Sequence, residues 1–298
     1  MSKPIPLVSV ITPYRNAAQW LSGLVETLQN QTYGHWECLL VDHGSTDGGP
    51  DLLQHCVADD LRFRCLTVPV SPDRRRPAGG PAVPRNVALM HATGELICFL
   101  DVDDLWHPCK LERQVQMHLG QQLDVSVTAY YRWSWRTPGQ MQWCSPPSRL
   151  TAWSWRWGNP FPMLTVMLSC GMLRSLPQPN AALFESVHHE DYLLWLRLAQ
   201  AFPSLRYGCV REGLAIHRRF QNNLTAQRWR MPMWTLGVYR RLGWSSWMCL
   251  LSLLVWTAAH AVRLVRERLG WGRRWLSPKT MLDSVPQGRK TLFQSDQQ

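Results

Sequence analysis

The sequence predicts an α/β fold in which a mostly parallel central sheet carries helices on both faces. Short apolar runs rich in Val, Leu and Ile occur at 7–12, 36–42 and 95–100, and turn-forming or acidic residues follow them. Segments with apolar residues at helical spacing separate these runs. Strands that alternate with helices form parallel sheets, whose ligands bind beyond the carboxyl ends of the strands.

The elements follow one another along the first 120 residues. The strand at 7–12 leads into a helix at 17–31, where Trp20, Leu21, Leu24, Val25 and Leu28 recur at helical spacing. After the strand at 36–42, the pattern predicts a helix around 52–57, a strand at 64–70, a helix at 86–94 that ends at Gly94, a strand at 95–100 and a helix at 110–120.

Three later regions have less regular patterns. Pro, Gly and Arg dominate 71–84, which is either a mobile loop beside the site or a solvated linker. From 124 to 183 no periodicity stands out, and six tryptophans lie among prolines. The segment 188–202 predicts an amphipathic helix that begins behind the acidic pair Glu190 and Asp191.

Composition limits the class of protein and its partners. The 298 residues suffice for one large domain with an appendage, and 45% hydrophobic against 18% charged residues exclude a disordered chain. A formal net charge of +11 favours an anionic partner such as a nucleotide diphosphate, a nucleic acid or a membrane surface. The nine cysteines include no C-x-x-C pair, and the amino terminus has no signal-peptide pattern, so we expect a cytoplasmic protein.

The acidic stretch that follows the strand at 95–100 is the strongest candidate for a metal site. Asp101 and Asp103 form an Asp-x-Asp pair, whose side chains point to the same side of an extended chain. Carboxylates at this spacing suit Mg²⁺ or Mn²⁺ bound together with a phosphate. The alternative is that Asp103 and Asp104 cap the helix that follows.

Three other kinds of site are excluded by spacing. An EF-hand that begins at Asp101 would require glycine where Trp106 stands. The His188-x-Glu190 pair lacks the P-C-x-x-C segment of zinc deaminases. No P-loop motif for nucleotide binding occurs in the chain.

Four segments in order resemble the family-two glycosyltransferases of the GT-A fold: VSVITPYRN at 8–16, QTYGHWECLLVDHGSTDGG at 31–49, PRNVALMHATGELICFLDVDDLWHP at 84–108 and HHEDYLLWLRLA at 188–199. The resemblance covers roughly the first two thirds of the chain. It implies an inverting transferase that uses a nucleotide-sugar donor, with Mn²⁺ or Mg²⁺ as its cofactor.

The resemblance also implies a role for each matching residue. Asp103, together with Asp101, would hold the metal, and Asp191 would be the general base, with Glu190 as the next candidate. The basic segment with His217 and Arg218 would close over the diphosphate, unless it is a solvated charge cluster. The residues expected to bind the nucleotide sugar are Pro13, Tyr14, Asn16, Asp42, His43, Arg85 and Asn86.

One position departs from the family pattern. The usual V-D-D-G-S-T-D appears here with His43 in place of the second acid, which in relatives often contacts the nucleobase. An imidazole can donate or accept a hydrogen bond depending on its tautomer. The choice of base therefore stays open, with a UDP-sugar favoured as donor.

The carboxyl-terminal part predicts a membrane-associated helix. No residue from 243 to 262 carries a formal charge, and arginines and tryptophans flank this run as they flank interfacial helices. The alternatives are a helix buried against the catalytic domain or a partner subunit, and a membrane span. We therefore divide the chain into a catalytic domain at 1–228, a helical segment at 229–276 and a flexible tail at 277–298.

Together these observations predict a cytoplasmic enzyme, peripheral at the inner face of the membrane, that adds a sugar to a glycan or lipid-linked acceptor for surface polysaccharide. Nucleic acid is not an expected partner. Two alternatives remain: a nucleotidyltransferase with the same metal and diphosphate chemistry, and a degenerate module that only binds sugar nucleotides. The sugar, acceptor and linkage depend on loop contacts that the sequence does not specify.

Overall fold

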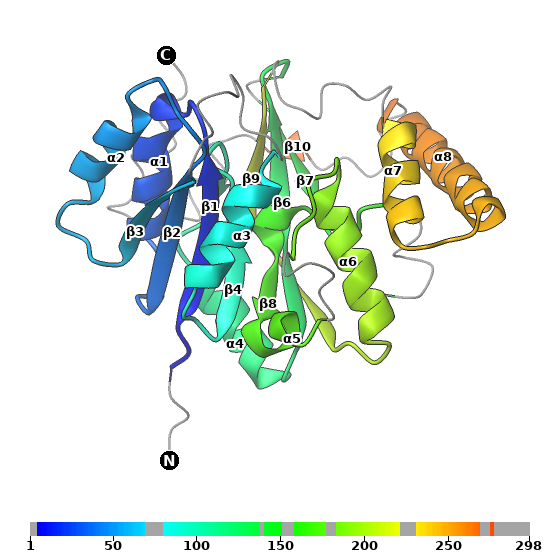
Figure 1. The fold of residues 1–298 in the computed structure, drawn as a ribbon, viewed down its shortest axis with the longest axis horizontal. Coiled ribbons are helices and arrows are strands. Elements are labelled where there is room, and N and C mark those ends of the chain that lie inside the picture. Colours follow the sequence, from blue (N-terminus) through cyan, green and yellow to red (C-terminus); the bar gives the residue numbers. More distant parts are fainter. Residues whose placement is uncertain are drawn as a thin grey trace.

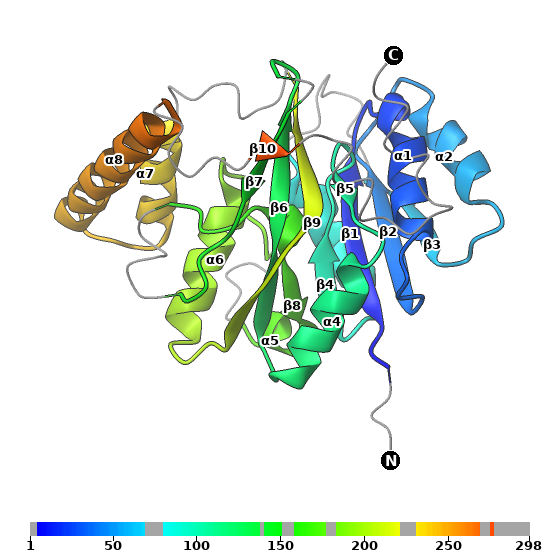
Figure 2. The same ribbon diagram turned by 180° about the vertical axis from the view of Figure 1, so that it is seen from behind.

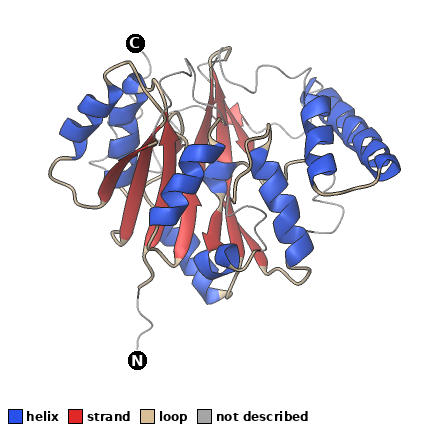
Figure 3. Ribbon diagram, in the orientation of Figure 1, coloured by secondary structure: helices blue, strands red, loops and turns tan. Residues whose placement is uncertain are grey.

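The structure is a computed structural model that describes residues 5–68, 80–137, 140–150, 158–176, 183–220, 231–268 and 275–276. Its strands form a single ten-stranded sheet at the centre of the molecule, with helices on both sides (Figures 1 and 3). The main order of strands is β10-β7-β6-β8-β4-β1-β2-β3, and β9 pairs with both β5 and β6. The predicted α/β class is therefore confirmed.

The amino-terminal half of the sheet is parallel. Its strands are β1 (Val8–Tyr14), β2 (Trp36–Asp42), β3 (Phe63–Thr67) and β4 (Leu96–Phe99), close to the predicted runs. Alternate residues face opposite sides: Val8 and Val10 contribute to one core cluster, and Ile11 contributes to the other. Burial on both faces explains why β1, β2 and β4 read as continuous apolar runs, whereas β3, at the edge of the sheet, is mostly half-buried or exposed.

The other half of the sheet is mixed, so the expectation of a mostly parallel sheet was wrong there. Five of the nine strand pairings in the described residues are antiparallel. In the described part of 124–183, the chain forms strands β6, β7 and β8, whose pairings with one another are antiparallel, together with turns and short helices instead of strand–helix–strand units. The remaining strands are β5 (Leu105–Trp106), β6 (Val125–Ser134), β7 (Met141–Cys144), β8 (Met167–Ser169), β9 (Tyr207–Arg219) and β10 (Trp275–Leu276).

Helices cover the two faces of the sheet in separate layers. On one face lie α1 (Ala18–Gln29), α2 (Gly49–Val57) and α4 (Lys110–Gly120), which share one core cluster. On the other lie α3 (Ala82–His91), α5 (Cys170–Arg174) and α6 (Glu190–Ala201), which share the second cluster. Figures 1 and 2 show α3 and α4 on opposite sides. A short turn of 3₁₀ helix spans Met163–Thr165.

Helix α3 begins earlier than the sequence predicted. The loop expected at 71–84 ends before Ala82, because Pro84 occupies the first turn of α3, where no backbone donor is needed. Residues 69–79 lie outside the described part, so neither interpretation of this loop is tested.

Two further helices extend the second layer: α7 (Met231–Arg241) and α8 (Ser246–Arg268), which form a pair at the edge of the molecule (Figure 1). Tyr239 of α7 stacks on Trp244 and lies against Tyr192 of α6. Among the described helices, none combines the length and the apolarity that crossing a bilayer requires. The predicted boundary at 228 and the tail at 277–298 lie outside the described residues.

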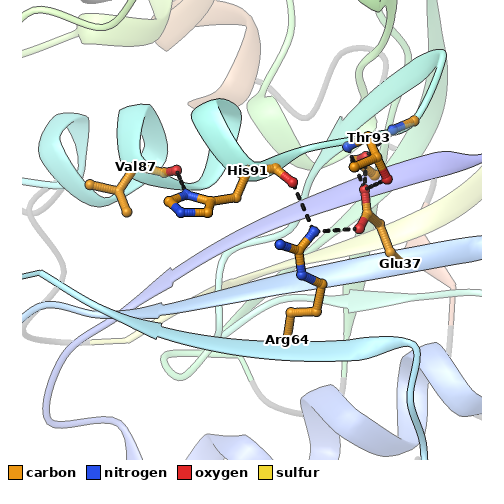
Figure 4. A network of polar contacts seen from close by, with 7 residues as sticks. Glu37, Arg64, Val87, His91 and Thr93 are labelled. Carbon is orange, nitrogen blue, oxygen red and sulfur yellow. Dashed lines mark hydrogen bonds and ion pairs between the residues drawn. The ribbon is translucent and has the colours of Figure 1, made fainter.

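A buried polar network holds α3 against the strands at the edge opposite the candidate site (Figure 4). Glu37 accepts hydrogen bonds from the Ser9 hydroxyl at 2.6 Å and the Thr93 amide at 2.7 Å, and it pairs with Arg64 at 3.0 Å. Burial alone would raise the pKa of Glu37, but these partners outweigh it and lower the pKa. A Cβ on Gly94 would lie 2.6 Å from the Leu7 carbonyl oxygen, so the close approach requires glycine.

Candidate functional site

Five of the residues expected to bind the nucleotide sugar lie at or just after the carboxyl ends of β1 and β2: Pro13, Tyr14, Asn16, Asp42 and His43. Tyr14 ends β1 and Asp42 ends β2, and the parallel register places these two residues opposite each other, with Pro13 opposite Val41. Tyr14 and Asp42 are both buried. The edge of the sheet that carries them is where open α/β sheets bind their ligands.

The turns that follow β1 and β2 are tied together by side-chain hydrogen bonds. Asp42 accepts from the Ser45 amide at 3.0 Å, while the Ser45 hydroxyl accepts from the Asn16 amide at 2.9 Å. Asn16, at a φ of 47°, accepts in turn from the Thr46 amide at 2.8 Å. Asp47 accepts from the Ala18 amide at the start of α1 at 2.9 Å. The two turns expected to bind the nucleoside are thus held in place by their own polar groups.

His43 lies in the turn that follows β2. Its side chain is buried, and its backbone amide donates to the Tyr14 carbonyl at 3.0 Å. Burial, helped by the nearby charge of Arg15, lowers the pKa of His43. A neutral imidazole at neutral pH can accept one hydrogen bond and donate another, which an acid in this position could not do.

Asp104 fixes the acidic turn that follows β4. The Asp104 amide donates to the Asp101 carbonyl at 3.0 Å, and its carboxylate accepts from the backbone amide of Arg218 in β9 at 3.0 Å. Burial and the charges of Asp103 and Asp101 raise the pKa of Asp104 well above its usual range. This residue therefore holds the turn against β9, while Asp101 and Asp103 stay closer to the surface.

The helix-cap alternative for Asp103 and Asp104 was wrong. Leu105 and Trp106 form strand β5, and α4 begins only at Lys110, behind Cys109. The acids lie too far before that helix to hydrogen-bond its free amide groups.

Arg85 lies at the centre of the candidate site. Its guanidinium pairs with Asp101 at 2.7 Å and with Glu190 at the start of α6. Burial disfavours the charge of Arg85, but Asp101 and Glu190 outweigh it and raise its pKa. Two acidic side chains, 16 and 105 residues away in the sequence, thus meet at the buried guanidinium of Arg85.

Asp191 lies beside this cation in the first turn of α6. Its carboxylate accepts from the Tyr192 amide at 2.8 Å and from the side-chain amide of Asn159 at 2.5 Å. Burial raises the pKa of Asp191 despite these donors and Arg85. Burial likewise raises the pKa of Glu190. A carboxylate with a raised pKa and fixed orientation suits a general base.

Asn86 is next to Arg85 but points elsewhere. Its side-chain amide donates to the Phe184 carbonyl at 2.7 Å and accepts from the Phe184 amide at 2.9 Å. These two bonds place the Phe184 ring, over which the Arg85 guanidinium lies at 5.7 Å. Asn86 thus supports Arg85, and its contact with the donor stays a prediction.

His217 and Arg218, which were both expected to close over the diphosphate, lie in different surroundings. Arg218 donates to the Asp103 carbonyl and lies over the Trp20 ring at 4.8 Å, at the acidic turn. His217 pairs across the sheet with Arg132, and its pKa is lowered to about 3 by burial and by neighbouring arginines. A neutral His217 does not supply positive charge to a diphosphate. Residues 221–230, which follow this segment, lie outside the described part.

Sequence reasoning missed Asn159, Asp47 and the role of Asp104. Asp47 precedes Gly48, Gly49 and Pro50, a pattern typical of a helix start, and it accepts a hydrogen bond from the Gly49 amide. Asn159 stands in a stretch without periodicity and reaches Asp191 only through the tertiary fold. No local pattern could have predicted it.

The residues present fit a divalent cation bound together with a diphosphate. Within the described residues, no group of three or more His, Cys, Asp or Glu side chains is arranged to hold a metal ion. Mg²⁺ in nucleotide sites commonly uses only one or two carboxylates and takes its other oxygen ligands from phosphates and water. Asp101 and Asp103 offer such a pair, although Arg85 already contacts Asp101.

Comparison with known proteins decides the family. The profile of glycosyl transferase family 2 matches residues 9–168, which is more than half of the chain. The chain belongs to glycosyl transferase family 2. The predicted resemblance is confirmed, and the protein is a transferase enzyme, which disfavours a module that only binds.

Two relatives extend this similarity. The chain is 31% identical over 80% of its length, and 88% of the relative, to TuaG of Bacillus subtilis, which is named as a glycosyltransferase of teichuronic acid biosynthesis. It is 33% identical over 64% of its length, and 69% of the relative, to WfgD of Escherichia coli, a UDP-Glc:α-D-GlcNAc-diphosphoundecaprenol β-1,3-glucosyltransferase.

Solved structures share the fold. Residues 1–349 of TarS from S. aureus, in complex with UDP-GlcNAc, have a TM-score of 0.63 at 18% identity, over 85% of this chain and 72% of that one. The mannosyltransferase PcManGT from Pyrobaculum calidifontis, in complex with GDP-Man and Mn²⁺, has a TM-score of 0.59 at 19% identity, over 88% and 76%. The fold of this family 2 enzyme is therefore GT-A-like, with a mixed sheet.

Proposed function

We propose that this family 2 glycosyltransferase moves a sugar from a nucleotide-diphosphate donor to a hydroxyl of a lipid-linked or glycan acceptor, with inversion. The observation that carries the proposal is the convergence of Asp101, Glu190 and Asp191 on Arg85 at the carboxyl edge of the sheet. The names of TuaG and WfgD support a place in surface polysaccharide synthesis. The expected setting is the cytoplasmic face of the membrane.

In this proposal each group has one task. The turns after β1 and β2 bind the nucleoside, with a UDP-sugar favoured. Asp103 and Asp101 hold Mn²⁺ or Mg²⁺, which neutralises the departing diphosphate when bound. Asp191 takes the proton from the acceptor hydroxyl, while Asn159 and the Tyr192 amide orient its carboxylate. Attack from the side opposite the leaving group inverts the anomeric centre.

A panel of nucleotide sugars tests the donor. Because a ligand that binds only the folded state raises the melting temperature, one donor should raise it clearly in the presence of Mn²⁺ and less in chelator. Release of a nucleoside diphosphate on adding acceptor then supports glycosyl transfer, whereas pyrophosphate released from a nucleoside triphosphate and a sugar phosphate, in a parallel assay, would establish the nucleotidyltransferase alternative. Absence of any shift across the panel would contradict the donor site.

A further inference from the structure

Helix α8 carries an apolar face that points away from the rest of the protein. Six large side chains at spacings of mainly three or four residues lie on one side of the helix, and each is more than half exposed: Trp247, Leu250, Leu251, Leu254, Val262 and Val265. We call these six residues the α8 face. At 1.5 Å per residue the face is about 27 Å long. Apolar exposure of this extent marks an interaction surface.

The opposite side of α8 fixes the helix to the catalytic part. Cys249 and Trp256 are buried, and the Trp256 ring stacks on His260 at 5.0 Å. Trp256 also packs against Gly158, where a Cβ would lie 3.2 Å from its indole nitrogen. Gly158 precedes Asn159, the residue that donates to Asp191, so α8 is held close to the turn that orients the proposed base.

Charge indicates which occupant fits the α8 face. No residue from 243 to 262 is charged, whereas two exposed arginines end α7 next to the start of α8: Arg240, and Arg241, which also pairs with Glu185. The whole chain has a formal net charge of +11. An apolar helix face with a tryptophan, bordered by arginines, is complementary to an anionic lipid surface, where the rings enter the headgroup region.

We propose that the α8 face docks on an anionic lipid surface. The inference rests on the proposed function, because it supplies the surface from which a lipid-linked acceptor would reach the site. Helices α6, α7 and α8 pack in sequence, with Tyr192 against Tyr239 and α7 against α8 (Figures 1 and 2). Docking through α8 therefore holds the Asp191 side of the site near the lipid.

Vesicle binding by the full chain tests the docking surface. The double variant Leu250→Glu/Leu254→Glu places two charges on the α8 face, and the matched control Leu61→Glu/Leu119→Glu places two on exposed leucines of the α2–β3 connection and α4. The parent and the control should sediment with phosphatidylglycerol vesicles and much less with pure phosphatidylcholine. The α8 variant should bind at least about tenfold more weakly, because two leucines that would enter the lipid are replaced by charged side chains.

Each other outcome overturns the docking surface. Equal binding by the α8 variant, with circular dichroism confirming its fold, would show that lipid contacts another part of the chain. A dimer in analytical ultracentrifugation that the α8 variant abolishes, without vesicle binding by the parent, would assign the face to a second copy. Donor hydrolysis by the parent without vesicle binding would remove the docking surface and leave the glycosyltransferase function standing.

Discussion

Replacing Asn159 by alanine should change the pH dependence of catalysis without removing the base. Asn159 donates to Asp191 at 2.5 Å, and this bond favours the ionised carboxylate and lowers its pKa against the effect of burial. A hydrogen bond to a charged group contributes about 1.5–3 kcal/mol, and one pKa unit corresponds to about 1.4 kcal/mol. Loss of the bond should therefore raise the pKa of Asp191 by about one to two units.

The sign of the effect follows from the role of a base. Only ionised Asp191 accepts the acceptor proton, so activity falls as pH drops through its pKa. With that pKa raised in Asn159→Ala, the acidic limb of kcat/KM should move to higher pH, while the rate at high pH changes less. Asp191→Asn should lose at least about a hundredfold in kcat at pH values where the parent's Asp191 is ionised, because asparagine keeps the shape but cannot accept the proton.

The assay measures nucleoside diphosphate release with acceptor, from acidic to neutral pH, for the parent and both variants. The double variant Asn159→Ala/Asp191→Asn is the control. Once the Asp191 carboxylate is gone, replacing Asn159 should not shift the acidic limb of the kcat/KM profile any further. Donor hydrolysis should fall less than transfer in Asp191→Asn. Near-parental transfer by folded Asp191→Asn would refute the assignment, and Glu190 would become the candidate base.

Three more changes test neighbouring residues. Asp103→Asn should abolish the metal-dependent rise in melting temperature with donor while leaving the fold intact by circular dichroism; an unchanged rise would remove the metal assignment. Asp104→Asn keeps an acceptor for the Arg218 amide and removes a buried charge. Because the folded pKa of Asp104 is raised, the parent should lose stability as pH rises above about 4, and the variant should lose less; identical pH-dependent melting curves would contradict this. Asn86→Ala should lower the free energy of unfolding by about 1–3 kcal/mol, because it leaves the backbone of Phe184 without partners; urea unfolding curves that superimpose on the parent's would rule out this support.

The sequence revealed most of the parallel half of the sheet because its strands β1, β2 and β4 are buried on both faces. Every residue of the strands at 8–14 and 36–42 is buried, so the bounds of these strands can be predicted without knowing their partner strands. The mixed half gave no such pattern. Strands β6 and β9 are long and partly exposed, and β9 pairs irregularly with β6 through two register shifts, so tertiary pairing decides their structure.

From the sequence, the candidate site could be predicted only where its residues are neighbours in the chain. The Asp-x-Asp pair and the Glu190–Asp191 pair are adjacent in sequence and were found as motifs. Their joint contact with Arg85 spans 105 residues to Glu190 and 16 to Asp101, and it depends on where α3 and α6 pack. His217 matched a motif as well, yet burial beside Arg132 and Arg219 makes it neutral.

The balance of charge in the site explains why several of its acids have raised pKa values. Five carboxyl groups, on Asp101, Asp103, Asp104, Glu190 and Asp191, lie around the guanidinium groups of Arg85 and Arg218. Burial alone raises the pKa of an acid, and the excess of negative charge raises it further for Asp104, Glu190 and Asp191. A nucleotide diphosphate would add negative charge to this cluster, so its binding should require added positive charge. A divalent cation at Asp103 meets that need with few protein ligands, because it would neutralise carboxylates and phosphates together. Metal binding should then lower the pKa of Asp191 as well and so favour the ionised form on which the proposed proton transfer depends.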